Sequence, residues 1–316
     1  MRRRSSIITI GISPAWDITC CGRNLDWDLH QHIDEQSIRP AGKALNVSKA
    51  LAWIGQQNIA AGLWGCDDCQ QMVIAVREMW PSITLRMSTV PGGTRQNVTV
   101  VDAATGREMH LRNKSRLAST KTIRKLRADL DAIVGQGSVC VFAGTMPEGE
   151  LLADITRLVE FCRSRGARIV LDTSGDALMQ IVDAGAAWLI KPNVEELRDL
   201  LEEPIKDGPV SLAQAGRKLL DKVEIVLISR GVKGSVVVTR KGAWQARCLS
   251  RAKVLSTVGC GDFLLAGFLK GLKDKFDARS ALNTAIKVAT ARAWGWTESK
   301  TWSQALREIK VAAERV

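Results

Sequence analysis

Short apolar runs alternate with helix-like amphipathic stretches along most of this 316-residue chain. The apolar runs are typical of buried strands. They cover residues 6–12, 59–64, 138–143, 168–172, 187–191, 225–229 and 235–239. Strands separated by helices predict an α/β fold with a mostly parallel sheet covered on both faces. Ligands of such a sheet bind at the carboxyl ends of the strands, so polar residues just after these runs are candidates for a site.

Two segments, residues 20–39 and 95–112, break this alternation. The second has a period of two in Asn97-Val98-Thr99-Val100-Val101 and resumes at residues 109–111, which predicts strands of a small separate sheet. We expect one domain over residues 1–316 with this sheet as an appendage, because the chain has no internal repeat or low-complexity linker.

Composition narrows the class of protein. A hydrophobic content of 46% can bury a full core, and no stretch reaches the roughly 20 apolar residues that a membrane span requires. Eight cysteines in a chain this long do not form a disulfide framework, which favours a reducing compartment. We therefore expect a cytoplasmic protein with no membrane partner.

The formal net charge of +12 raises the question of nucleic acid. Residues 107–127 are rich in Lys and Arg, and Glu108 is the only acidic residue among them. The segment lacks the interleaved aromatic residues of a nucleic-acid surface, so a solvated face that steers anionic substrates is favoured. We expect no nucleic-acid partner.

The segment with the most chemical content is Ser256-Thr257-Val258-Gly259-Cys260-Gly261-Asp262, followed by the helix-prone residues 263–269. Its two glycines permit a tight turn, and the helix start adds unpaired N–H groups and the positive end of its dipole. These features predict an anion hole, with Asp262 placed to take a proton from an attacking hydroxyl. The alternative is a simple turn with Asp262 as the helix N-cap.

Two further helix starts carry polar residues. Asn193 and Glu196 share a face of a first helical turn, where they could hold a hydrated Mg²⁺ or form a capping box. Lys43 and Asn46, in a segment of small residues, could donate to sugar hydroxyls or a phosphate.

Together with Ser13-Pro14-Ala15-Trp16-Asp17, these motifs resemble the PfkB (ribokinase-like) family of carbohydrate kinases, over about residues 7–296. The similarity is greatest to its phosphosugar branch, which includes 1-phosphofructokinase, tagatose-6-phosphate kinase and the minor 6-phosphofructokinase. The resemblance implies a three-layer sandwich with a mostly parallel central sheet and a small β-sheet lid, here about residues 15–40 and 95–113. It also implies a possible homodimer through the lid.

The resemblance assigns a role to individual residues. Asp262 becomes the catalytic base, beside an anion hole made by the amides of Gly259, Cys260 and Gly261. Thr94-Arg95-Gln96-Asn97 matches a segment whose arginine reaches the substrate phosphate, which a guanidinium fork suits. The full set of implied substrate-binding residues is Asp17, Gly42, Lys43, Asn46, Arg95 and Thr145.

On the nucleotide side the resemblance implies ATP as phosphoryl donor and Mg²⁺ at Asn193 and Glu196. The loop from Ser229 to Gly234 matches a glycine loop of the family. The implied nucleotide-binding residues are Lys191, Asn193, Ser229, Gly231, Gly234 and Asn283.

The chain departs from the family pattern at several positions. Ala41 and Ala44 replace glycines, and an added methyl could block a backbone position that needs a positive φ. Trp16 could reshape the sugar pocket. His30 and His32 stand where relatives often carry Lys or Arg, which would make phosphate binding dependent on pH.

The sequence thus predicts ATP-dependent phosphorylation of a hydroxymethyl group on a sugar phosphate, with fructose 1-phosphate, fructose 6-phosphate or tagatose 6-phosphate as candidates. One alternative is a kinase of an unphosphorylated sugar or nucleoside. The other is a non-catalytic sensor of sugar phosphate or nucleotide.

Overall fold

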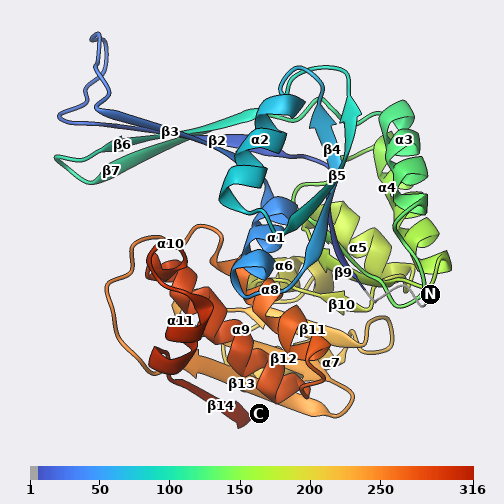
Figure 1. Ribbon diagram of the computed structural model, residues 1–316. Helices are drawn as coiled ribbons and strands as arrows, with labels where there is room; N and C mark the ends of the chain where they lie inside the picture. Colours follow the sequence, from blue (N-terminus) through green and yellow to red (C-terminus); the bar gives the residue numbers. More distant parts are fainter. Residues whose placement is uncertain (1–5) are drawn as a thin grey trace.

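A computed structural model of the chain describes residues 6–316 and is built around a ten-stranded sheet (Figure 1). The strand order is β14-β13-β12-β11-β10-β9-β8-β1-β4-β5. The strands are β1 (Ile7–Gly11), β4 (Asn58–Gly65), β5 (Ile83–Val90), β8 (Val139–Ala143), β9 (Arg168–Asp172), β10 (Leu189–Ile190), β11 (Ile225–Ser229), β12 (Ser235–Thr239), β13 (Gly242–Cys248) and β14 (Val311–Arg315).

The sheet is parallel from β5 to β11 and antiparallel at the edge made by β12, β13 and β14. The predicted α/β fold with a mostly parallel sheet is confirmed, and all seven predicted strands are present. The sequence pattern did not predict three strands: the two edge strands β5 and β14, and β13, which lies next to β14. Their residues are half-exposed and mixed in polarity, so they lack the continuous apolar run of a central strand.

Helices cover both faces of this sheet and make a three-layer arrangement. One face carries α1 (Lys43–Trp53), α8 (Cys260–Lys273) and α9 (Ala278–Ala293), whose apolar residues share one core cluster with the sheet. The other face carries α3 (Thr120–Asp131), α4 (Glu150–Ser164), α5 (Gly175–Asp183), α6 (Val194–Leu201) and α7 (Pro209–Arg217). The remaining helices are α2 (Cys69–Met79), α10 (Trp296–Ser299) and α11 (Trp302–Glu308).

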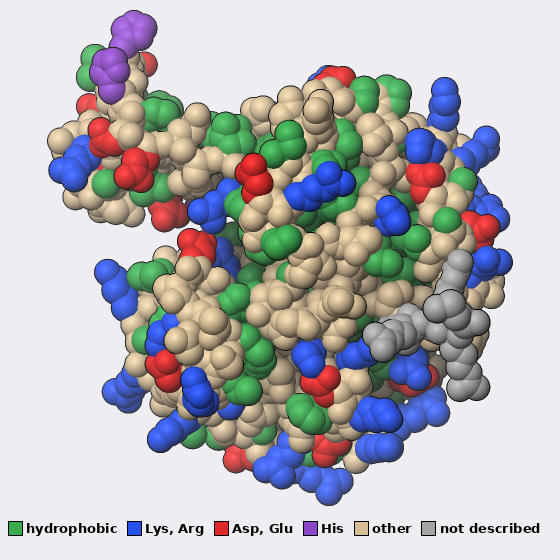
Figure 2. All heavy atoms as spheres, in the orientation of Figure 1, with side chains coloured by type: hydrophobic (Ala, Val, Ile, Leu, Met, Phe, Trp, Pro, Cys, Tyr) green, Lys and Arg blue, Asp and Glu red, His purple; other side chains and the backbone are tan. Residues whose placement is uncertain are grey.

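A separate four-stranded sheet has the order β3-β2-β6-β7 and projects from the body of the molecule (Figure 1). Its strands are β2 (Ala15–Gly22), β3 (Glu35–Ala41), β6 (Gln96–Asp102) and β7 (Arg107–Arg112), so the predicted small sheet is confirmed. Figure 2 shows a notch between this sheet and the body. Arg39 of β3 pairs with Glu298 of α10 at 3.2 Å, which links the sheet to the body.

The loop between β2 and β3 lies at the free end of this sheet and contains His30 and His32, both exposed (Figure 1). These two imidazoles therefore lie at the end of the sheet away from the body.

No helix formed by residues 6–316 is both long and apolar enough to cross a membrane. All eight cysteines lie within this part of the chain, and each is a free thiol. The expectation that they form no disulfide framework agrees with the structure.

Helices α8 and α9 approach each other closely because two glycines of α8 face small residues of α9. A methyl group on Gly267 would lie 2.8 Å from Cα of Ala285 and 2.9 Å from a methyl of Val288. A methyl on Gly271 would lie 2.7 Å from Cα of Ala281. The position of the α8 N-terminus therefore depends on a backbone contact that no larger residue permits.

We expect Gly267→Ala to lower the free energy of unfolding by about 1–3 kcal/mol, because overpacking against backbone exceeds the gain of about 1 kcal/mol in helix propensity. Denaturant unfolding would measure the change. Gly135→Ala is the matched control, since a methyl there meets nothing within 4 Å. Equal stability of the two variants would contradict the close-packing argument.

Candidate active site at the amino end of helix α8

Asp262 lies in the first turn of α8, buried at the centre of a polar cluster. The helix begins at Cys260, earlier than the apolar run suggested, and Gly259 is its N-cap with a φ of 79°. Asp262 is therefore not the N-cap, so that part of the alternative is wrong. Its side chain is only 5% exposed, which is unusual for an unpaired carboxylate and needs a compensating environment.

The backbone at this helix start provides the unpaired N–H groups of an anion site. The left-handed φ of Gly259 turns the chain sharply into the helix, and the amide of Gly261 has no carbonyl one turn earlier to bind. The amide of Cys260 donates to the Thr257 carbonyl at 3.3 Å, a long bond that an incoming anion could replace. Charge on a ligand here would also be stabilised by the helix dipole.

Burial, and after it the negative charge of Asp172, raise the pKa of Asp262 to about 7. Three groups oppose the shift: Nδ2 of Asn46, which donates to Oδ2 of Asp262 at 3.0 Å, and the charges of Lys43 and Lys191. The result is a carboxyl group that changes charge near neutral pH. A general base works best with such a pKa.

Asp172 is the second buried carboxylate, at the carboxyl end of β9 and 1% exposed. Its Oδ1 lies 3.4 Å from Nζ of Lys43 and 3.2 Å from Nζ of Lys191. Its Oδ2 and the hydroxyl of Thr173 are buried without a hydrogen-bond partner among the described residues. Its position just after a predicted strand marked Asp172 as a candidate for the binding crevice, but the sequence assigned it no role.

Lys43 and Lys191 enter this cluster from different elements. Lys43 is the first residue of α1, and Asp172 raises the pKa of its ammonium group more than burial lowers it. Lys191 follows β10, is buried, and its Nζ would lie 3.4 Å from a methyl built on Gly261. Both cations therefore lie beside the start of α8, where they would attract a phosphate.

Two residues of the predicted sugar side lie near this cluster, since Asn46 contacts Asp262 and the charges of Asp17 and Asp262 both act on Lys49. Asp17 on β2 accepts a hydrogen bond from Asn97 of β6 at 2.8 Å, and Asn46 of α1 reaches Asp262. Thr145 is exposed just after β8, next to Gly144, whose Cα faces the side chain of Lys43. Four elements thus contribute polar groups around one space.

Gly42 is the only residue of the Ala41-Gly42-Lys43-Ala44 run with a positive φ, at 116°. A methyl on Gly42 would lie 3.3 Å from Cα of Pro14, so a side chain is excluded there. Ala41 and Ala44 have ordinary backbone angles, in β3 and α1 respectively. The expected block by their methyl groups does not occur, because neither position needs a positive φ.

Trp16 does not enter the sugar pocket. It is buried beside Trp64 with an edge-to-face ring contact of 5.6 Å, and its Nε1 donates to Asp68 at 2.8 Å. Asp68 also accepts from the backbone N–H and the hydroxyl of Thr94. Since Asp17 points to the opposite face of β2, Trp16 and Asp68 fix the strand behind the pocket.

Arg95 is anchored to the protein itself. Its guanidinium donates to the carbonyls of Ser13, Pro14 and Asn113 and to the side chain of Asn97. It also lines an open hollow of about 530 Å³, together with Gly93, Arg112, Asn113, Lys114 and Arg116. Part of the basic segment 107–127 therefore faces this hollow, which has four cationic side chains and no acidic one in its lining.

The predicted nucleotide side adjoins the site through two loops. Asn193 and Ser229 form a parallel bridge, and the amide of Ser229 donates to the Pro192 carbonyl at 3.0 Å. Gly231 and Gly234 have φ values of 56° and 90°, and a methyl on Gly234 would lie 2.1 Å from the Ala246 carbonyl oxygen. Glycine is therefore required at Gly234 for the loop to pass β13.

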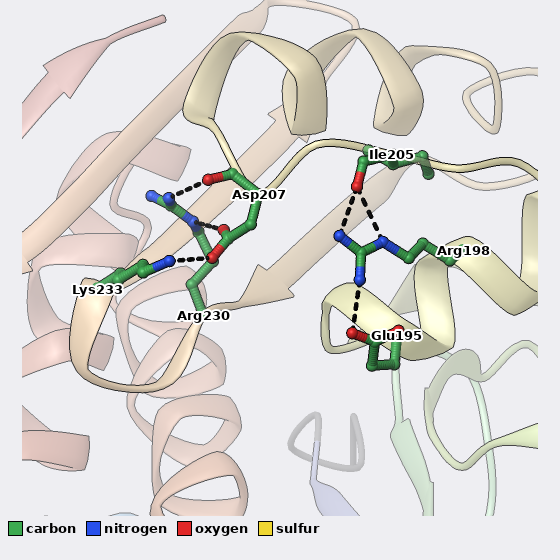
Figure 3. A network of polar contacts seen from close by, with 6 residues as sticks. All are labelled: Glu195, Arg198, Ile205, Asp207, Arg230 and Lys233. Atoms are coloured by element: carbon green, nitrogen blue, oxygen red, sulfur yellow. Dashed lines mark hydrogen bonds and ion pairs between the residues drawn. The ribbon is translucent and has the colours of Figure 1, made fainter.

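Asp207 fixes this loop from outside (Figure 3). Its carboxylate accepts from Arg230 at 2.7 Å and from Lys233 at 2.6 Å. In the neighbouring segment, Arg198 donates to the Ile205 carbonyl and to Glu195 (Figure 3). Asn283 is half-buried within α9, and no hydrogen bond recorded for the described chain joins it to the residues above.

Comparison with known proteins identifies the family. The model of the pfkB family of carbohydrate kinases matches residues 6–293. The chain belongs to this family. A 1-phosphofructokinase of Vibrio cholerae is 29% identical over 284 residues, which cover 90% of this chain and 88% of that protein.

Solved structures of carbohydrate kinases share this fold. Phosphofructokinase-2 from Escherichia coli, in complex with fructose-6-phosphate, has a TM-score of 0.87 and 20% identity, covering 96% of this chain and 98% of its own. A possible 1-phosphofructokinase from Thermotoga maritima has a TM-score of 0.78 and 22% identity, covering 98% and 99%. Membership in a carbohydrate kinase family implies ATP as the phosphoryl donor.

The residues predicted for Mg²⁺ form a capping box at the start of α6. Oδ1 of Asn193 accepts from the Glu196 amide and Oε2 of Glu196 accepts from the Asn193 amide, each at 2.8 Å. The second carboxylate oxygen of Glu196 stays available, and the charge of Glu196 raises the pKa of Lys43 in the cluster. A hydrated Mg²⁺ needs only one or two carboxylates beside phosphate oxygens, so this donor set fits such an ion.

The pKa of Asp262 predicts the pH dependence of phosphoryl transfer. A carboxyl group that acts as a base must be ionised, so with Asp262 in this role kcat/KM should be lost as pH falls through about 7 and level off above it. Asp172→Asn removes a like charge and leaves Lys43 and Lys191 uncompensated, and both changes favour ionised Asp262. We therefore expect the kcat/KM profile of Asp172→Asn to have its midpoint at lower pH than the profile of the wild type. Asp183→Asn, an exposed control paired with Lys222, should keep the wild-type midpoint. A midpoint that rises or stays in place in Asp172→Asn would contradict the electrostatic account.

Proposed function

We propose that this carbohydrate kinase transfers the γ-phosphoryl group of ATP to a hydroxymethyl group of a sugar phosphate. The observation that carries the proposal is the buried Asp262 beside the unpaired amides of α8, with a pKa near neutrality. Lys43 and Lys191, which both pair with the neighbouring Asp172, supply the positive charge that a triphosphate requires. The named relative, a 1-phosphofructokinase, supports a phosphosugar as acceptor.

In the proposed reaction the hydroxyl oxygen of the acceptor attacks the γ-phosphorus in line. The new O–P bond forms as the bond to the bridging oxygen breaks, ADP leaves with that electron pair, and Asp262 takes the hydroxyl proton. Asn46 holds Oδ2 of Asp262, while Asp17 and Asn46 would orient the sugar hydroxyls. The amides of Gly259, Cys260 and Gly261 would bind the transferred group.

The remaining predicted residues divide between the two substrates. Gly42, Lys43 and Thr145 would contact the acceptor, and Lys191, Ser229, Gly231, Gly234 and Asn283 would contact the nucleotide. Asn193 and Glu196 would hold Mg²⁺, which when bound neutralises phosphate charge. The chain's own contribution is to position both substrates, since positioning supplies much of the rate in phosphoryl transfer.

We assign the phosphate already present on the acceptor to the hollow lined by Arg95, Arg112, Lys114 and Arg116. Most donors of Arg95 are bound to protein carbonyls, so Arg95 would shape this hollow while the exposed Arg112 and Arg116 supply free donors. The small sheet that carries Arg112 would act as a lid and exclude water from the transfer. A homodimer through this sheet and a cytoplasmic location stay predictions.

Asp262→Asn tests the base directly. We expect kcat to fall by at least about 10²-fold while ATP affinity changes little, because the amide keeps the shape but cannot accept the proton. A coupled assay for ADP over a panel of sugars and sugar phosphates measures turnover, and calorimetry measures ATP binding. Asp199→Asn, exposed on α6, is the control. A near wild-type rate in Asp262→Asn would remove Asp262 from the mechanism, and binding without turnover in the wild type would favour the sensor.

Arg112→Ala tests the acceptor phosphate. We expect KM for the sugar phosphate to rise about tenfold or more with KM for ATP unchanged, because a charge-assisted phosphate contact is lost. Arg95→Ala should raise the same KM and also lower thermal stability, since it ties residues 13–14 to Asn113. Preference for unphosphorylated sugars, with no effect of Arg112→Ala, would instead support the kinase of a free sugar or nucleoside.

A further inference from the structure

Arg292, in the last turn of α9, lies beside the anion site at the start of α8. A methyl group built on the N-cap Gly259 would lie 3.5 Å from Nε of Arg292 and 3.9 Å from Oδ2 of Asp262. The guanidinium and the carboxylate therefore face one point at the helix start. No sequence motif indicated Arg292, because it is distant in the chain from the glycine run and lies in a helix of mixed polarity.

The spacing of these two groups suits a phosphoryl group between them. Each lies within 4 Å of the same point, which limits their separation, yet Arg292 and Asp262 form no ion pair in the described chain. A group bound at the helix start would therefore lie within reach of both charges. A tetrahedral phosphoryl group, with an attacking hydroxyl on the side of Asp262, fits that description.

The charge of Arg292 is not neutralised by a carboxylate of residues 6–316. Its one recorded contact is with the ring of Phe263, 5.8 Å from the guanidinium carbon, and the side chain is half-buried. Its charge acts on two neighbours: it opposes the burial that raises the pKa of the Cys260 thiol, and it adds to the burial that lowers the pKa of Lys49 to about 8. An uncompensated guanidinium beside an anion hole is a built-in donor for a phosphate oxygen.

The loop before α8 fixes this arrangement. The amides of Leu255 and Ser256 both donate to the carbonyl of Ala293, at 2.8 Å and 3.3 Å. The glycine run therefore starts from the end of α9, next to Arg292. The close contact at Gly267 also holds α8 against α9, so the position of the Arg292 guanidinium relative to the start of α8 is fixed.

We infer that Arg292 is a catalytic residue that binds the γ-phosphoryl oxygens and stabilises the charge that develops on them during transfer. This inference rests on the proposed function. As the acceptor oxygen bonds to phosphorus and the bridging oxygen departs with its electron pair, the equatorial oxygens keep their negative charge. Arg292 donates to these oxygens, while the hydroxyl proton goes to Asp262.

The test compares Arg292→Met with Arg292→Lys and with the control Arg307→Met. Methionine keeps the apolar stem that packs on Phe263 and removes the charge, and Arg307 is exposed on α11. We expect Arg292→Met to lower kcat by about 10²-fold to 10³-fold, with KM for ATP changed less than about threefold. In Arg292→Lys, kcat should fall less than in Arg292→Met. Added guanidinium ion should restore part of the kcat of Arg292→Met. A rate of Arg292→Met within about twofold of Arg307→Met, or a loss that appears only in KM, would overturn the inference.

A second measurement separates this inference from the proposed function and does not depend on the acceptor. Aluminium fluoride with ADP and magnesium mimics the transferred phosphoryl group, so its presence should tighten ADP binding to the wild type and to Arg307→Met. We expect that gain to be lost in Arg292→Met. An equal gain in all three proteins would overturn the role of Arg292. Absence of sugar phosphate turnover in the wild type would instead overturn the proposed function and leave this binding comparison as the test of Arg292.

Discussion

The site depends on the interaction between two buried carboxylates, Asp172 and Asp262. Burying two negative charges close together is unfavourable unless cations or hydrogen bonds compensate them. Asp172 receives that compensation from Lys43 and Lys191, whereas Asp262 has only the amide of Asn46 as a direct partner. Asp172 therefore holds the two lysines in place. Asp262 becomes a group that can gain and release a proton near neutral pH.

The fold brings these groups together from the ends of two strands and the starts of two helices. The carboxyl ends of β9 and β10 supply Asp172 and Lys191, and the starts of α1 and α8 supply Lys43, Asn46 and Asp262. Helices α8 and α9 are held in contact by glycines at their interface, which fixes the anion site relative to the sheet. On the outer side, Asp207 ties the glycine loop of residues 231–234 to its neighbours (Figure 3). A rigid frame of this kind allows catalysis by positioning.

Much of this could be predicted from the sequence, because local patterns carry it. The seven buried strands, the small sheet and the capping box of Asn193 and Glu196 follow from periodicity and residue spacing. The strands β5, β13 and β14 could not be predicted, since half-exposed strands lack a continuous apolar run. Arg292 was missed, and Asp172 was placed at the crevice without a role, because the significance of both comes from neighbours that are distant in the chain. The anchoring of Arg95 by carbonyls depends in the same way on long-range geometry.

The most direct measurement of the central claim is a pH titration of the aspartate carboxyl carbons by NMR in protein labelled at those carbons. The account predicts one aspartate resonance that titrates near pH 7 and is absent from the spectrum of Asp262→Asn. If every aspartate of the wild type titrated below about pH 5, in the ordinary range for this side chain, Asp262 would be an ordinary carboxylate and the account would be contradicted.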